Sequence, residues 1–295
     1  MRVAHEEHPP LRHRLFAMHL LSVPPARGAY WLRAGFEVFK TQPLGFVALY
    51  ILGWLINLVL MQLAGIVGIV AGLAMTPLMS LAFLIATQRG LHGGRVGPNA
   101  LIDVFKGTAD QRVRMAKLCG LYVLAVFVLA LVTAICTADL LAPALVQIER
   151  GVPADQISWP ADVIQGLLIR GSALVLLGFL PLMLAFWHAP ALVHGGGERP
   201  LRALYGSLYS CWMNRGAFAV MLGLSLAAGT LVMGMLSVLG DVLGHPSWLP
   251  FISTPLTATL ASVFYVAMWF SIADSFDWPK TAPTSRPSED QAPPA

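Results

Sequence analysis

The sequence predicts an all-α, polytopic membrane protein with about six transmembrane helices, and composition, hydropathy and apolar tracts lead to this fold class. Charged residues make up 12% of the 295 residues and apolar residues 57%, whereas roughly 25% of an average soluble protein is charged. The mean hydropathy of the chain is +0.69. A soluble fold of this length could not cover its surface with so few charges, whereas a bilayer solvates apolar side chains directly.

The apolar tracts have the length that a membrane requires. Crossing a bilayer takes roughly 20 mostly apolar residues, because lipid leaves no water to satisfy an exposed backbone. None of the tracts has a charge near its centre, and the first two form one stretch divided by a turn near residues 62–65. The expected spans are residues 44–63, 66–87, 118–138, 171–192, 216–239 and 250–273.

The membrane domain is expected to cover residues 28–276. Residues 1–27 read as a disordered cytoplasmic leader, because their apolar stretch is short, is interrupted by His19 and precedes no cleavage site. Met1 and Met18 both remain candidates for the true start. Residues 277–295 are rich in proline and small polar residues, which indicates a disordered cytoplasmic tail.

The distribution of positive charge predicts the orientation. Of the 19 Arg and Lys residues, 17 lie before span 1, between spans 2 and 3, between spans 4 and 5, or after span 6. The alternate side holds only Arg150 and Arg170, and it includes an insertion at residues 139–165. Because basic loops stay in the cytoplasm, we expect both termini to be cytoplasmic and the insertion to be periplasmic in a bacterial inner membrane.

A threefold internal repeat is predicted by self-comparison. Residues 34–40 (AGFEVFK), 100–106 (ALIDVFK) and 203–209 (ALYGSLY) each precede an odd-numbered span, and Pro-Leu recurs in the even-numbered spans. Two spans in each unit make every copy enter from the same side. The units should therefore be parallel, related by rotation about the membrane normal.

Each unit is expected to begin with a short interfacial helix. Arg33, Glu37 and Lys40 are spaced along one helical face, and Asn99, Asp103 and Lys106 have the same spacing in the second copy. A helix with one charged and one apolar face lies in the membrane interface. The alternative is a cytoplasmic extension of the following span.

Two segments carry a resemblance. Residues 23–36 (VPPARGAYWLRAGF) and 181–192 (PLMLAFWHAPAL) resemble an uncharacterised family of bacterial six-span inner-membrane proteins. More distantly, they resemble the membrane domain attached to some glycerophosphodiester phosphodiesterases. The resemblance covers roughly residues 23–276. It implies the fold and the membrane but no activity, since the family offers no catalytic residues to carry over.

Five basic residues on the expected cytoplasmic face are candidate contacts for an anionic lipid headgroup. Each such charge near an anionic leaflet contributes about 1 kcal/mol of attraction. The last three lie within two helical turns, so one headgroup could meet several of them. The alternative is that these charges only set the orientation of the chain. The candidates are Arg89, Arg95, Arg112, Arg114 and Lys117.

Histidine and glycine occur together in two turns that leave even-numbered spans. His92-Gly-Gly lies near Arg95 and His194-Gly-Gly near Arg199. Glycine-rich turns can bind phosphate through backbone N–H groups, and the alternative is a flexible link. His188 is expected to be an interfacial residue rather than a base.

Three prolines are candidate helix breaks. Pro77, Pro181 and Pro255 lie in the even-numbered spans. Proline lacks the N–H group that a helix needs and displaces the carbonyl four residues earlier. Such breaks line cavities in transporters, but they also occur in ordinary spans, where neighbouring groups satisfy the freed carbonyl.

The sequence predicts no enzyme, cofactor or metal site. The three cysteines form no Cys-x-x-Cys pair, and no catalytic or phosphate-binding motif is present. The basic balance reflects cytoplasmic loops rather than nucleic-acid binding. We expect a non-enzymatic membrane component that interacts with lipid or with a protein partner. The alternative is a transporter or channel for a neutral or amphipathic solute, since no ionisable residue lies deep in a span.

Overall fold

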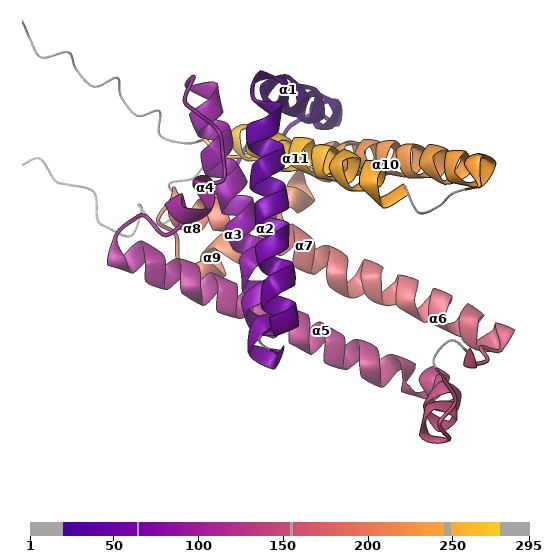
Figure 1. Cartoon of the computed structure of the whole chain (residues 1–295). Helices are drawn as coiled ribbons and strands as arrows, with labels where there is room; N and C mark the ends of the chain where they lie inside the picture. Colours follow the sequence, from indigo (N-terminus) through magenta and orange to yellow (C-terminus); the bar gives the residue numbers. More distant parts are fainter. Residues whose placement is uncertain (1–19, 64, 154–155, 245–248, 278–295) are drawn as a thin grey trace, which may run out of the picture.

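The computed structural model describes residues 20–277, apart from residue 64, residues 154–155 and residues 245–248 (Figure 1). The fold of these described residues is all-helical, with one isolated β-bridge between Leu20 and Phe276. Six helical segments are long and apolar enough to cross a membrane. They confirm the predicted fold class and the number of spans.

The helices follow one another along the chain with short connections. A π-helical segment, Val175–Phe179, joins α6 to α7. In order, the α-helices are α1 (Arg27–Thr41), α2 (Pro43–Leu63), α3 (Gly65–Leu91), α4 (Ala100–Asp103), α5 (Ala109–Glu149), α6 (Ala161–Leu174), α7 (Leu180–Trp187), α8 (Ala189–His194), α9 (Pro200–Met213), α10 (Arg215–Leu243) and α11 (Leu249–Ser275).

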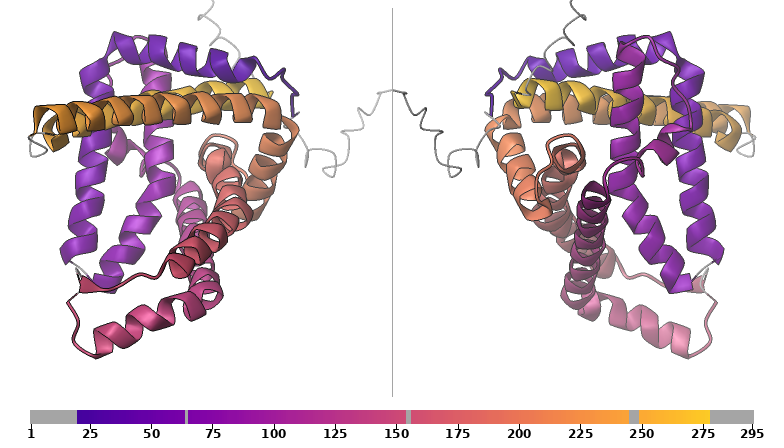
Figure 2. Two further views of the ribbon diagram at one scale, coloured as in Figure 1. Left: turned by 90° about the vertical axis from the view of Figure 1, so that its right-hand side faces the viewer. Right: turned by 90° about the vertical axis from the view of Figure 1, so that its left-hand side faces the viewer.

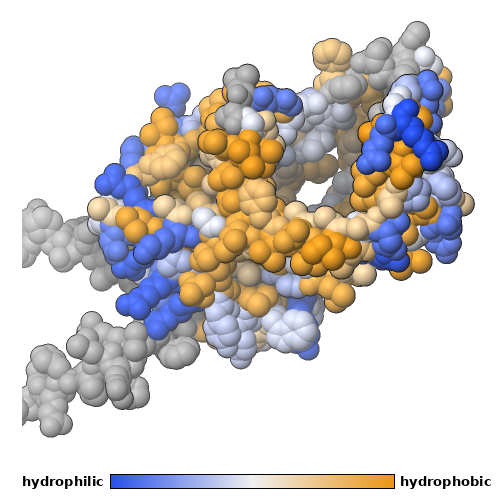
Figure 3. All heavy atoms as spheres, turned by 90° about the horizontal axis from the view of Figure 1, so that it is seen from below, coloured by the Kyte–Doolittle hydropathy of each residue, from blue (hydrophilic) through white to orange (hydrophobic). Residues whose placement is uncertain are grey.

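The long helices form three hairpins that diverge from a common base (Figure 2). The hairpins are α2–α3, α5 with α6 and α7, and α10–α11. The base consists of α1, α4, α8 and α9 together with the ends of the long helices that pack against them, and we call the rest of each hairpin an arm. Seen from below, apolar residues cover the middle of the molecule and hydrophilic residues gather towards its two ends (Figure 3).

The buried core lies in the base. One cluster joins α2, the second half of α3, the first turns of α5, and α8, with Phe46, Phe83 and Leu118 completely buried. A second cluster surrounds Trp31 of α1 and includes Met221 of α10. The base is therefore the part of the described chain in which apolar side chains pack against protein.

Helix α1 packs on α10 and α11, so its apolar face contacts protein instead of the lipid that we expected. Its buried face contains Gly28, Trp31, Gly35 and Phe39. The glycines permit backbone contact, because a Cβ on Gly28 would lie 2.0 Å from the carbonyl oxygen of Ala217. The expected charged face does form, with Lys40 Nζ 2.8 Å from Glu37 Oε2. The opposite face meets protein rather than lipid.

The second expected interfacial helix is also corrected. Helix α4 ends at Asp103, so it is shorter than expected and Lys106 lies beyond it, although the Asp103 and Lys106 side chains still pair. Asp103 turns inward instead. Its side chain is only 10% exposed and lies 2.5 Å from Arg89 Nη2 and 2.6 Å from Lys106 Nζ.

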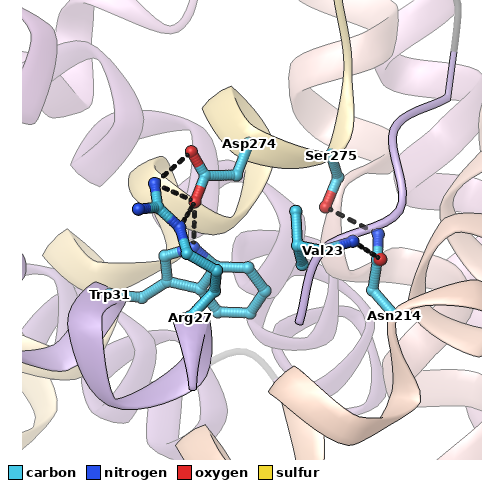
Figure 4. A network of polar contacts seen from close by, with 6 residues as sticks. All are labelled: Val23, Arg27, Trp31, Asn214, Asp274 and Ser275. Carbon is cyan, nitrogen blue, oxygen red and sulfur yellow. Dashed lines mark hydrogen bonds and ion pairs between the residues drawn. The ribbon is translucent and has the colours of Figure 1, made fainter. Parts of the chain in front are cut away.

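The first described residues are held in place, so the expected disordered leader does not extend to residue 27. The N–H of Leu21 donates to the Ser275 carbonyl at 3.0 Å. Asn214, between α9 and α10, accepts from the Val23 N–H at 2.9 Å (Figure 4) and donates to the Leu21 carbonyl at 3.0 Å. Residues 1–19 and most of the expected tail, residues 278–295, lie outside the described part of the chain.

An ion pair joins α1 to the last turn of α11. Arg27 binds Asp274 through two hydrogen bonds of 2.7 Å, and the Trp31 indole N–H donates to the same carboxylate at 2.7 Å (Figure 4). A bidentate guanidinium–carboxylate pair fixes both position and direction. The start and the end of the membrane domain are thus linked.

Three amide side chains occupy related positions. Gln42, directly before α2, donates to the Gly94 carbonyl at 2.8 Å, and Gln111, near the start of α5, donates to the His194 carbonyl at 3.2 Å. Asn214, directly before α10, donates to Ser275 Oγ at 3.3 Å. Each amide joins the beginning of one hairpin to the chain that leaves it. The rotation predicted to relate the three units remains a prediction.

The candidate helix breaks differ from one another. Helices α3 and α11 continue through Pro77 and Pro255. Pro181 instead follows the π-helical segment by two residues. Because proline has no N–H, the Leu177 carbonyl loses its usual partner, and a widened turn accommodates the change.

The predicted insertion, residues 139–165, is largely helical. Helix α5 continues through Pro143 to Glu149, and α6 begins at Ala161. Gln147 closes the connection, since its side chain accepts from the Ser158 N–H at 2.9 Å and donates to the Ser158 carbonyl at 3.1 Å. The insertion therefore lengthens an arm.

Candidate functional site

A groove with a volume of about 900 Å³ lies between the beginnings of α5 and α9. One end of its lining is basic and the other is apolar. The lining residues are Asp110, Val113, Arg114, Lys117, Gly120, Leu121, Leu124, Arg199, Pro200, Leu201 and Arg202.

The local sequence of α5 places the groove residues on one face. Thr108 caps the helix, accepting from the Gln111 N–H at 3.2 Å while Gln111 Oε1 accepts from the Thr108 N–H at 2.9 Å. This reciprocal capping box fixes the helix start. From Asp110, steps of three or four residues reach Lys117 and then Leu124, so the groove face changes from charged to apolar along the helix.

Helix α9 supplies the opposite wall. Pro200 occupies the first turn, where its fixed backbone angle favours a helix start. Arg199 and Arg202 flank this start, and Arg202 Nη1 lies 3.7 Å from Glu198 Oε2. The wall therefore adds two guanidinium groups to the basic end.

The His194-Gly-Gly turn holds the two walls together. Its backbone carbonyls accept hydrogen bonds from α5, with Gln111 donating to His194 at 3.2 Å and Arg114 donating to Gly197. Gly197 has a φ of 65°, the left-handed region that glycine adopts without strain. The turn thus supplies acceptors to α5, and phosphate binding by its N–H groups stays a prediction.

Of the five predicted headgroup residues, the groove brings together only Arg114 and Lys117. Arg114 also pairs with Asp110. Among the described residues Lys117 forms no ion pair, and it is exposed. Arg95 and Arg112 do not line the groove, and Arg89 is held by Asp103.

The sequence interpretation missed two groove residues, Arg199 and Arg202. Arg199 was noted only as a neighbour of the His194-Gly-Gly turn. Their spacing of three residues at the start of a helix was an available signal, but nothing in the sequence indicates that this helix faces α5. With them, the groove contains four cationic side chains and one carboxylate.

Asp103 neutralises a second group of cations away from the groove. Hydrogen bonds from Arg89 and, secondarily, from Lys106 hold the pKa of the Asp103 carboxyl below its usual value. Ion pairing favours the charged form of a carboxyl group, which is the cause of the shift. Arg89 therefore has a structural partner.

His188 is completely buried, which corrects its expected interfacial position. Its Nε2 lies 3.2 Å from Ser271 Oγ, and its backbone N–H donates to Ser207 Oγ at 2.9 Å. Because Ser271 donates its own proton to the Met268 carbonyl at 2.8 Å, Nε2 carries the hydrogen that His188 donates. His188 thus joins α7, α9 and α11 inside the base.

Comparisons with known proteins agree with a membrane location. No protein-family model matches the chain, and no solved structure is significantly similar to it. A Burkholderia thailandensis protein named "Probable inner membrane protein" is 28% identical over 263 residues, which cover 88% of this chain and 94% of that protein. The resemblance to phosphodiesterase-linked domains stays a prediction. The six apolar helices and the similarity to this relative together support a multi-pass inner membrane protein.

Proposed function

We propose that this protein is a non-enzymatic component of the bacterial inner membrane that binds an anionic phospholipid in the groove between α5 and α9. The observation that carries the proposal is the order of the groove lining. Four cationic side chains lie at the end where α5 begins, and Leu121 and Leu124 lie further along the same helix. A phospholipid has the same order of phosphate and acyl chain.

The length of the groove face supports a lipid in one leaflet. Asp110 and Leu124 are 14 residues apart on α5, about 21 Å at the helical rise of 1.5 Å per residue. Half of a bilayer of roughly 40–45 Å has a similar thickness. Beyond the groove, exposed side chains such as Leu131, 61% exposed, continue the apolar surface.

The chemistry of the basic end favours phosphate. Guanidinium groups bind phosphate oxygens through paired hydrogen bonds, and Lys117 adds a charge that no described carboxylate neutralises. The proposal includes the predicted orientation with both termini in the cytoplasm. Anionic lipids are concentrated in the cytoplasmic leaflet, where they attract basic segments.

A charge-neutralising variant tests the groove. We expect Lys117→Gln with Arg199→Gln to weaken binding of phosphatidylglycerol about 30-fold, because each charge contributes about 1 kcal/mol. The matched control is Arg112→Gln with Arg33→Gln, which removes the same charge from exposed positions outside the groove. Native mass spectrometry of the purified protein with phosphatidylglycerol measures retention.

The measurement includes a topology check, because basic residues also orient the chain. The reporter is one that is active only outside the cytoplasm. It should be active when fused after Asp155 and inactive when fused after Lys106. Equal phosphatidylglycerol retention by the groove variant and the control, with topology preserved, would show that these residues serve orientation alone.

The second candidate function is transport of a neutral or amphipathic solute. It is favoured by a cavity of about 230 Å³ among the spans, bordered by Pro77 and by Phe179 of the π-helical segment. Irregular helices line substrate pathways in transporters. Flux of a neutral solute into liposomes that contain the protein, above that into empty liposomes, would support this function.

A further inference from the structure

The cavity among the spans has a lining that the groove does not share. It lies where α3, α5, the π-helical segment, α7 and α11 meet, and its volume is about 230 Å³. Six of its twelve lining residues are aromatic, and none is charged. The aromatic residues are Tyr122, Phe179, Phe186, Trp187, Phe264 and Tyr265.

Ring contacts hold three of these aromatic side chains, Trp187, Phe264 and Tyr265, in position around the cavity. Phe264 lies edge-to-face with Trp187, at a centroid distance of 5.4 Å, and with Tyr265, at 6.4 Å. Phe83 stacks on Tyr265 from the core side at 4.7 Å. Aromatic pairs prefer such offset and edge-to-face geometries. The walls therefore suit another flat ring.

Hydrogen-bonding groups are present in the same lining. Tyr122, Tyr265, Thr76 and Ser80 contribute hydroxyl groups. Within the described residues, no hydrogen bond engages the phenol groups of Tyr122 and Tyr265, whereas the Ser80 hydroxyl contacts the Thr76 carbonyl at 3.5 Å. A hydroxyl group without a partner in hydrocarbon is costly, so a ligand with acceptor oxygens gains from these donors.

Size and charge restrict the ligand further. Pockets for drug-sized ligands measure roughly 300–1,000 Å³, so this cavity matches a single ring rather than a larger molecule. No charged side chain belongs to its described lining, so a neutral ligand fits it better than an ion. A flexible acyl chain would fill the space but would leave the phenol hydroxyl groups without acceptors.

We propose that this cavity binds a neutral planar ring that carries carbonyl oxygens, the chemistry of a membrane quinone headgroup. The ring packs between the aromatic walls, and the hydroxyl groups of Tyr122 and Tyr265 donate to its carbonyls. The proposal concerns binding and is independent of the lipid groove.

Decylubiquinone tests the proposal with the full chain in nanodiscs. We expect saturable binding of one decylubiquinone per protein, measured by equilibrium dialysis. The Tyr122→Phe/Tyr265→Phe variant should bind at least tenfold more weakly, because it keeps the rings and loses the donors. The matched control, Tyr205→Phe on α9, alters a residue that is 66% exposed and should bind like the wild type.

Decylbenzene distinguishes a site that recognises the carbonyl groups of the ring from a general apolar one. It has the ring and the tail without carbonyl groups, so we expect it to bind weakly and equally to the wild type and to the double variant. The absence of saturable decylubiquinone binding, unchanged binding by the double variant, or tight decylbenzene binding would each overturn the proposal. The double variant should keep the melting temperature and the phosphatidylglycerol retention of the wild type. A loss of decylubiquinone binding then reports on the cavity and not on folding or on the lipid groove.

Discussion

The base and the arms both contain many large apolar residues, yet they expose them very differently. Trp31 and Phe46 in the base are completely buried, whereas Leu177 and Leu226 in the arms are 80% and 72% exposed. In the base, apolar side chains pack on protein at close to crystal density. In the arms, lipid must take that place. Hydropathy therefore identifies what enters the membrane but not which surface meets protein.

The same difference separates individual helices. In their most apolar 18-residue windows, 44% of α3 and 39% of α11 is buried, against 11% of α5 and 6% of α10. Helices α3 and α11 are thus the central elements, and both also line the cavity. Variants at matched positions in the base and in the arms test this division.

The largest difference is expected from two truncations in one helix. Met221→Ala in the base part of α10 empties a completely buried site, whereas Leu226→Ala shortens a side chain that is 72% exposed. Cavity formation costs about 2–5 kcal/mol, and exposed substitutions usually cost less than about 0.5 kcal/mol. Thermal unfolding in detergent measures both. Equal losses in melting temperature would show that α10 is buried along its whole length, against the proposed division.

Two ion pairs offer the next comparison. Asp274→Asn weakens the carboxylate that holds Arg27 and Trp31 in the base, and we expect a loss of about 1.5–3 kcal/mol. Asp139→Asn weakens the pair with Arg170 in an arm, where the side chains are 62% and 44% exposed. Exposed pairs contribute about 0–1 kcal/mol. Urea titration monitored by circular dichroism compares them, and a larger loss for Asp139→Asn would contradict the division.

Glycine substitutions should differ in sign. Gly28→Ala forces a Cβ against the Ala217 carbonyl and should cost about 1–3 kcal/mol. Gly223→Ala in α10 meets no atom within 4 Å, and alanine favours a helix by about 0.5–1 kcal/mol over glycine. The melting temperature should therefore fall for the first variant and hold or rise for the second. A tolerated Gly28→Ala would show that α1 does not contact α10 closely.

The smallest expected effect is a pH dependence at Asp103. Its folded-state pKa is lowered by Arg89 and Lys106, so its stabilising contribution is fully present above the unfolded value of about 3.9. The contribution is lost as pH falls through the folded-state value. Asp103→Asn should cost about 1 kcal/mol at pH 7.

The measurement for Asp103 is the melting temperature between pH 7 and pH 3. The gap between the wild type and Asp103→Asn should narrow below about pH 4, as the wild-type carboxyl group becomes protonated. Arg112→Gln, which removes an exposed charge outside this contact, serves as the control. A gap that is constant with pH would show that the Asp103 charge does not stabilise the fold.

The spans could be predicted from the sequence, because a helix that crosses lipid needs an unbroken run of apolar residues, and such a run is visible in the sequence itself. The sequence was not sufficient for α1. Trp31 and Gly35 fit an interfacial helix and a docked helix equally well, and only the positions of Ala267 and Ala217 decide between them. Contacts between residues distant in the chain leave no local pattern.

The candidate site shows the same limit. Arg114 and Lys117 were predicted from their spacing within one helix, but Arg199 and Arg202 lie across the groove, at the start of α9 in the base. Asp103 was expected on an exposed face because its spacing repeats that of Glu37. It is buried beside Arg89, which lies in the last turn of α3 and pairs with it.

The link between Arg27 and Asp274 has a consequence for the order of biosynthesis. The two residues are 247 positions apart, and ribosomes add about 5–20 residues per second. The glycine-lined face of α1 therefore waits roughly 10–50 s before α11 is synthesised. During that interval the membrane interface, which suits its amphipathic pattern, can shelter this face. The amphipathic pattern of α1 then suits its position at the membrane interface early in biosynthesis. Its contact with α11 forms last.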